Sequence, residues 1–135
     1  MGSIQLLAVI MLSFIAASCS DIVESSYADI DEARREQVFE RGWLPDILPP
    51  STKLITTRND LDLNLSDGQF TIDPQEFFMF QAQTKECTKS RKNVDELLDY
   101  AKRGYRPFCF SSDDSTWRFY INRETGHCKY QMKPN

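Results

Sequence analysis

The stretch YRPFCFSSDDSTWRFYINRETGHCKYQM, residues 105–132, decides the fold. Apolar and polar residues alternate along it, and turn-forming residues interrupt it at 112–115 and 123–126. Alternation between short polar turns is typical of antiparallel strands that bury one face. We therefore predict a three-stranded meander in which Phe119 and Ile121 lie on the inward face of the middle strand.

Two helix-start patterns precede this meander. Residues 73–76 combine an aspartate N-cap, a proline at the first helical position and the glutamate of a capping box, which predicts a helix that continues to about residue 84. Residues 93–96 form a second start pattern, with Asn93 as the N-cap and Glu96 as the glutamate of a capping box. The helix that follows should end at Gly104 and present one apolar face, made of Val94, Leu97, Leu98 and Ala101.

The first half of the chain predicts one further helix and a hairpin. The helix should run over 30–41, with Asp29 or Asp31 as its cap and Gly42 as its stop. A proline-rich segment at 42–50 should lie as an extended belt against the core, because Trp43, Leu44, Ile47 and Leu48 need burial. A strand from Lys53 should alternate through Leu65, turn at 66–68 and return over 69–72.

The predicted order αββααβββ indicates an α+β fold. Consecutive strands joined by short turns favour a mainly antiparallel sheet, and we expect the helices to cover one face of it. The length of 135 residues suits one domain. We place this globular domain at residues 30–135, after a tether at 19–29.

The N-terminal segment predicts export. Residues 1–18 contain no charged side chain, and the apolar run at 4–17 has the length of a signal-peptide core, short of the roughly 20 residues of a membrane span. The small residues 16–18 followed by Cys19 resemble the lipobox of bacterial lipoproteins. That resemblance implies cleavage after residue 18 and a diacylglycerol on Cys19, which would tie the domain to a lipid bilayer. Ordinary secretion and an uncleaved anchor stay open as alternatives.

The residue after the cysteine indicates the membrane. In the sorting rule that the lipoprotein resemblance implies, an aspartate at this position retains the protein at the inner membrane. The chain has Ser20 there. We therefore expect a cell-envelope protein that is anchored in the outer membrane and faces the periplasm.

A second resemblance covers part of the mature chain. The string RGWLPDILPPSTKLITTRNDLDLN at 41–64, followed by GQF at 68–70, is similar to the start of small bacterial cell-envelope lipoproteins, some of them YbbD-like. No reaction is assigned to that family. The resemblance therefore implies a place in the cell and no active site.

Cysteine content predicts a disulfide. With Cys19 lipidated, an oxidising compartment favours pairing among Cys87, Cys109 and Cys128. In the predicted register Cys109 lies opposite Arg118, whereas Cys128 lies opposite Ile121 on the other face, so these two should not bond to each other. Cys87 could reach either, and three reduced thiols are the alternative.

The candidates for catalysis and metal binding are weak. The only histidine, His127, precedes Cys128 in a predicted strand, so the two side chains should point to opposite faces and form no nucleophile–base pair. The run Asp60-x-Asp62-x-Asn64 resembles the start of a calcium loop, but a leucine follows where that loop has glycine. We therefore predict no enzyme, no cofactor and no metal site.

Charge limits the partners. The chain has 16 basic and 20 acidic side chains and a net charge of −4, which argues against nucleic-acid binding. Residues 20–76 carry a net charge of −8 and residues 77–135 a net charge of +4. The predicted contact surface consists of Trp43, Lys89, Arg91 and Lys92. Another envelope protein or an anionic envelope polymer would fit this surface. The alternative to an anchored envelope protein is that the chain is a secreted or periplasmic soluble module that binds or inhibits a target.

Overall fold

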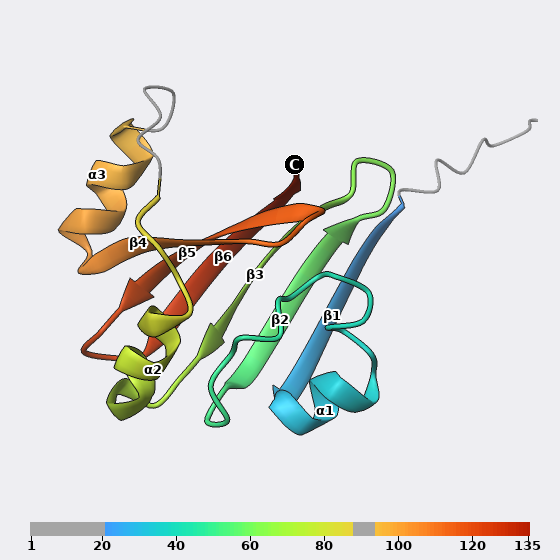
Figure 1. Cartoon of the computed structure of the whole chain (residues 1–135), viewed down its shortest axis with the longest axis horizontal. Helices are drawn as coiled ribbons and strands as arrows, with labels where there is room; N and C mark the ends of the chain where they lie inside the picture. Colours follow the sequence, from blue (N-terminus) through green and yellow to red (C-terminus); the bar gives the residue numbers. More distant parts are fainter. Residues whose placement is uncertain (1–20, 88–93) are drawn as a thin grey trace, which may run out of the picture.

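Six strands form one antiparallel sheet in the computed structural model, which describes residues 21–87 and 94–135 (Figure 1). In space the strands follow the order β1-β2-β3-β6-β5-β4. The three N-terminal strands and the three C-terminal strands are thus joined by the pairing of β3 with β6. The strands are β1 (Ile22–Asp29), β2 (Lys53–Asp60), β3 (Leu65–Thr71), β4 (Tyr105–Ser111), β5 (Ser115–Asn122) and β6 (His127–Pro134).

Four short helical segments accompany the sheet within the described residues. They are α1 (Ile30–Arg35), the 3-10 turn η1 (Pro74–Glu76), α2 (Phe77–Ala82) and α3 (Val94–Lys102). Asp29 caps α1 by accepting a hydrogen bond from the Glu32 amide, and Asp73 caps η1 through the Gln75 amide, so these two predicted helix starts are confirmed. Asn93, the expected cap of the third helix, lies outside the described residues. The fold is α+β and mostly sheet.

The glutamate of the expected capping box has a different partner. Glu76 accepts a hydrogen bond from the Ser51 amide at 3.1 Å, and the Ser51 hydroxyl accepts one from the Asp73 amide at 2.9 Å. The Asp73 amide and the Glu76 carboxylate, which bond to each other in a capping box, therefore both bond to Ser51, the residue that follows the belt. A local motif has become a tertiary contact between η1 and residue 51.

The core lies on one face of the sheet, which we call the inner face. Phe70 and Phe119 on the strands meet Phe80 of α2 in edge-to-face contacts, with ring centroids 6.3 and 5.1 Å from that of Phe80. All three rings are fully buried. The belt covers the same core, as predicted, since Leu44 and Leu48 are buried and Trp43 and Ile47 pack against it.

The C-terminal meander is confirmed in extent and register. Cys109 pairs with Arg118, and Cys128 pairs with Ile121. The turn between β5 and β6 depends on Gly126, whose φ of +75° is left-handed and whose missing side chain leaves room for the carbonyl oxygen of Ile72. Any Cβ at this position would collide with that oxygen.

The expected tether is wrong for residues 22–29, which form strand β1. The strand pairs antiparallel with β2, from Ile22 opposite Asp60 to Asp29 opposite Lys53. Tyr27 is buried in the core while its neighbours are exposed, a pattern that the low hydrophobicity of the segment concealed. A mostly polar strand is stable at a sheet edge because its partner supplies the backbone hydrogen bonds.

The first helix ends six residues earlier than expected. Gln37 adopts a left-handed φ of 59°, and the amides of Gln37 and Val38 bond back to the carbonyls of Arg34 and Ala33. This is a Schellman end, which packs Val38 against Ala33, both fully buried. The gain from burying Val38 outweighs the strain of a non-glycine residue at this position. Gly42 closes a second turn of the same kind.

The hairpin turn between β2 and β3 lies at residues 61–64, not at the expected 66–68. The Asp60 carboxylate accepts a hydrogen bond from the Leu63 amide at 3.0 Å, and Asn64 takes a left-handed φ of 51°. Gly68 lies instead within β3, where the Thr56 carbonyl of β2 approaches so closely that no side chain fits.

Helix α3 covers the opposite face of the sheet, so the expectation that all helices share one face is wrong. Its Tyr100 stacks on Tyr120, with ring centroids 4.0 Å apart, and Tyr120 alternates along β5 with the inward residues. Val94 and Leu98, expected on the buried face of the helix, are exposed. The stacking of Tyr100 on Tyr120 thus determines where α3 packs on the sheet. We call the face of the sheet that carries Tyr120 the outer face.

Candidate functional site on the outer face of the sheet

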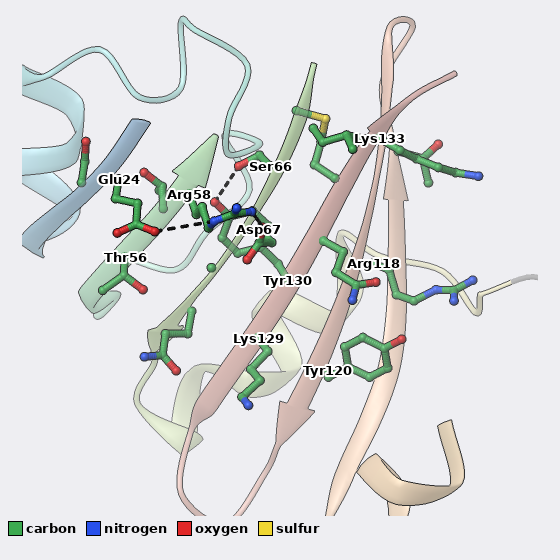
Figure 2. Close-up of a pocket in the computed structure, with 18 of the residues that line it drawn as sticks. Glu24, Thr56, Arg58, Ser66, Asp67, Arg118, Tyr120, Lys129, Tyr130 and Lys133 are labelled. Atoms are coloured by element: carbon green, nitrogen blue, oxygen red, sulfur yellow. Dashed lines mark hydrogen bonds and ion pairs between the residues drawn. The ribbon is translucent and has the colours of Figure 1, made fainter. Parts of the chain in front are cut away.

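The outer face is open and hollowed. Helices α1 and α2 and the belt lie on the inner face, and α3 covers only the β4–β5 end of the outer face. A hollow of about 1020 Å³ remains over the strands. Figure 2 shows its charged and aromatic side chains, which come mainly from Glu24, Arg58, Asp67, Arg118, Tyr120, Lys129 and Lys133.

One half of the hollow contains an ion-pair cluster of one base and two acids, with a net charge of −1. The Arg58 guanidinium on β2 lies 3.6 Å from the Glu24 carboxylate on β1 and 3.6 Å from the Asp67 carboxylate on β3. All three side chains are exposed to solvent, so each ion pair adds at most about 1 kcal/mol to stability. The cluster therefore defines the charge of this half more than it stabilises the fold.

The other half is basic. Arg118, Lys129 and Lys133 project from β5 and β6, whereas Glu24 and Asp67, the acids among the described lining residues, belong to the first half. Lys129 lies with its ammonium 5.8 Å from the centroid of the Tyr100 ring. Antiparallel strands buried on one face commonly carry polar residues on the other, and here these residues include three cations beside the neutral Thr116 and Gln131.

Two tyrosines form the wall below α3. Tyr100 lies between the Tyr120 ring and the guanidinium of Arg103, which is 4.8 Å from its centroid. Burial raises the pKa of Tyr120, and the neighbouring Arg118 opposes part of that rise. Besides burial, the charge of Glu96 also raises the pKa of both phenols. Both phenols therefore remain neutral at physiological pH and contribute aromatic faces and hydroxyl groups to the wall.

A hydrogen-bonded chain lies beside this wall. The Tyr105 hydroxyl is 2.8 Å from His127 Nδ1, and His127 Nε2 is 3.0 Å from the side-chain oxygen of Gln69. These partners satisfy a neutral imidazole that accepts at Nδ1 and donates at Nε2. Desolvation, followed by the charge of Lys129, lowers the pKa of His127.

The imidazole should accordingly titrate below its ordinary pKa of about 6.5, which NMR can follow because His127 is the only histidine. As pH falls through this range the unfolded chain binds the proton first, so the free energy of unfolding should decrease. Lys129→Gln should raise the pKa of His127, while Lys133→Gln, six residues and about 20 Å along β6 from His127, should not change it. A pKa at or above 6.5 in the parent protein would contradict this assignment.

The structure does not bring the expected contact residues together. Trp43 lies in the belt on the inner face, where its carbonyl accepts a hydrogen bond from Trp117 Nε1 at 3.2 Å and Arg41 lies over its ring. It does not line the hollow. The expected basic residues Lys89, Arg91 and Lys92, and the expected lipidation residue Cys19, lie outside the described residues.

The cysteines form one disulfide in the described chain, between Cys87 and Cys109. Cys109 also lines the hollow, which links the covalent bond to the site. Cys128 is a free, fully buried thiol, and burial raises its pKa. It points to the inner face and His127 to the outer face, so this pair does not form the thiol and base of a nucleophilic site.

The calcium-like run is part of the turn after β2. Asp60 bonds to the Leu63 amide, and Asp62 lies beside Asp21, whose hydrogen bond and charge raise the pKa of Asp62. Within residues 21–87 and 94–135, no group of three or more histidine, cysteine, aspartate or glutamate side chains can hold a metal ion.

The residues that line the hollow follow a pattern that the sequence contains. Arg118 and Tyr120 alternate with Trp117, Phe119 and Ile121 in β5. This alternation separates the two faces of one strand. The alternation does not predict which strands lie next to β5. That Arg58 and Lys129 line the same hollow therefore follows only from the order of the strands in the sheet.

The fold and the site together define an α+β domain with a six-stranded antiparallel sheet whose polar face is open in the described part of the chain. Residues 21–71, from the start of β1 to the end of β3, match the family model described as the YbbD head domain. The resemblance to YbbD-like proteins is thus confirmed for these residues. No curated protein and no solved structure matches the chain.

Proposed function

We propose that the chain is a non-enzymatic, lipid-anchored protein of the bacterial cell envelope whose domain binds another envelope protein through the outer face. The anchor is an acylated Cys19, and Ser20 favours the outer membrane with the domain in the periplasm. The observation that carries the binding proposal is the hollow, in which a basic half adjoins a half whose ion-pair cluster has a net charge of −1.

The proposed compartment is supported by two features. The disulfide between Cys87 and Cys109 suits an oxidising environment such as the periplasm. The apolar residues 4–17 precede a cysteine at the position where lipoproteins are acylated. Among the described helices none is long and apolar enough to cross a membrane.

A protein partner is favoured over an anionic polymer by the mixed charge of the hollow. A polymer of uniform negative charge would approach Lys129 and Lys133 but would be repelled by Glu24 and Asp67. A folded partner can place acids opposite the basic half and a base opposite the cluster of Glu24, Arg58 and Asp67. The tyrosine wall adds an aromatic surface of the kind that protein interfaces favour.

The anchor is tested by the mass of the N-terminal peptide of the protein isolated from its native membrane fraction. We expect Cys19 as the first residue, carrying a diacylglyceryl group. An unmodified N-terminus or an intact Met1 would contradict the lipid anchor. The binding proposal would then have to be tested on a secreted or membrane-inserted form.

The binding surface is tested by charge reversal. The double variant Lys129→Glu with Lys133→Glu places two acids in the basic half, and like charges across an interface weaken binding by roughly tenfold or more. In-cell crosslinking followed by purification from the envelope should capture an acidic protein with the parent chain and lose it with this variant.

Lys53→Glu is the matched control, because Lys53 is an exposed β2 lysine that does not line the hollow. It should capture the same protein as the parent. Equal capture by all three chains would show that the partner binds elsewhere. Crosslinking to polysaccharide instead of protein would replace the proposed partner with an anionic polymer.

A further inference from the structure

Three leucines are exposed where β2 leads into β3, and we call them the leucine tip: Leu61 and Leu63 of the turn, and Leu65, the first residue of β3, which also lines the hollow. Their exposed fractions are 53%, 62% and 40%. Large apolar side chains that are exposed close together commonly mark an interaction site, and these three lie within five residues of the chain. None of them contributes to the core on the inner face.

The backbone holds the leucine tip in a defined shape. The Asp60 carboxylate accepts a hydrogen bond from the Leu63 amide, and the Leu61 amide donates to the carbonyl of Asp21 at 3.0 Å. Asn64 closes the turn in the left-handed region. The leucines are therefore exposed by an ordered turn that is bonded to the start of the described chain.

The leucine tip lies close to the N-terminal end of the described chain. Asp21 is the first described residue, and Cys19 precedes it by two positions, a distance of at most about 7 Å along an extended chain. An acyl group on Cys19, or a retained apolar segment at 4–17, would bring the membrane to this end of the sheet. Figure 1 shows the turn beside the start of β1, at the opposite end of the sheet from α1 and α2.

We propose that the leucine tip inserts into the interfacial region of the bilayer to which the chain is anchored. This inference rests on the anchor proposed above, because three leucines alone bind a bilayer weakly, and a tether raises their local concentration at its surface. Asp21, Asp60 and Asp62 flank the tip and would be repelled by anionic lipids, so the occupant is a zwitterionic lipid surface. The strands would then lead away from the membrane and present the outer face to the periplasm.

Depth-dependent quenching of a tryptophan tests the insertion. The full chain carrying Leu63→Trp is purified with its natural N-terminus and reconstituted into phosphatidylcholine vesicles with or without brominated acyl chains. Bromine quenches only nearby tryptophans, so we expect emission from this residue to fall roughly twofold or more, as for side chains at the acyl boundary. The signal of the parent chain, which contains Trp43 and Trp117, is subtracted.

Met79→Trp is the matched control, since Met79 is an exposed apolar residue of α2, at the far end of the sheet. Its emission should be the same in both vesicles. Adding Leu61→Asp to Leu63→Trp should remove the quenching, because a charge at the tip opposes insertion. Circular dichroism establishes that each variant is folded.

Equal emission of Leu63→Trp in the two vesicles would overturn the inference, whether a second copy of the chain covers the tip or water does. The mass of the N-terminal peptide, measured on the same sample, reports the anchor independently. Acylation without quenching would retain the anchor and reject insertion, whereas quenching without acylation would retain insertion and reject the lipid anchor.

Discussion

Replacing Phe119 with alanine should lower the free energy of unfolding by about 3–5 kcal/mol, the usual cost of removing a large aromatic side chain from a core. Phe119 is fully buried in β5 and contacts Phe80 of α2 and Phe70 of β3, with ring centroids 5.1 and 6.2 Å from its own. Its removal leaves a cavity where the helix meets two strands. Urea unfolding followed by tryptophan fluorescence measures the change.

Phe78→Ala is the control for the same chemical change at an exposed position. Phe78 is 67% exposed on α2, although it contacts Phe77 and lies under Arg123. Its loss should cost less than about 1 kcal/mol. If the two alanine variants were equally stable, α2 would not be packed on the sheet as described.

Replacing Cys87 with serine should lower the free energy of unfolding by about 2–4 kcal/mol under non-reducing conditions. The disulfide to Cys109 closes a loop with a sequence separation of 22 and includes α3 within it. Without the bond the unfolded chain gains conformational freedom, while the native state loses a covalent link beside the hollow. Lys85 and Cys109 retain two backbone hydrogen bonds of 2.8 Å, so we expect destabilisation without loss of the fold.

Reduction of the parent protein should reproduce the stability of Cys87→Ser, and adding reductant to that variant should change little further. The double variant with Cys109→Ser should differ from the single variant by less than the first substitution costs, since the bond is already absent. Stability equal to the parent in non-reducing buffer would indicate that the disulfide does not form.

Local patterns predicted much of the fold because the relevant contacts lie close in sequence. The alternation of β5 predicted its two faces, and two short turns then determined the register that separates Cys109 from Cys128. The caps at Asp29 and Asp73 were equally readable, since the amides they bind lie within three residues.

The errors share one cause, which is that distant residues altered a local preference. Residues 22–29 look like a polar tether until β2 provides a pairing edge. The first helix ends early because the core accepts Val38, and α3 lies on the outer face because Tyr100 finds the ring of Tyr120. None of these partners can be read from the segment concerned.

For the site, the sequence by itself determined the chemistry available: an uncharged N-terminal segment followed by Cys19, cysteines for one disulfide, and a basic C-terminal half. Only the tertiary structure decided which groups meet. The order β1-β2-β3-β6-β5-β4 places Glu24 and Arg58 across one hollow from Lys129, although more than 100 residues separate the first from the last. Side-chain alternation is local and readable, whereas the neighbour of a strand depends on the free energy of the whole sheet, which no single segment contains.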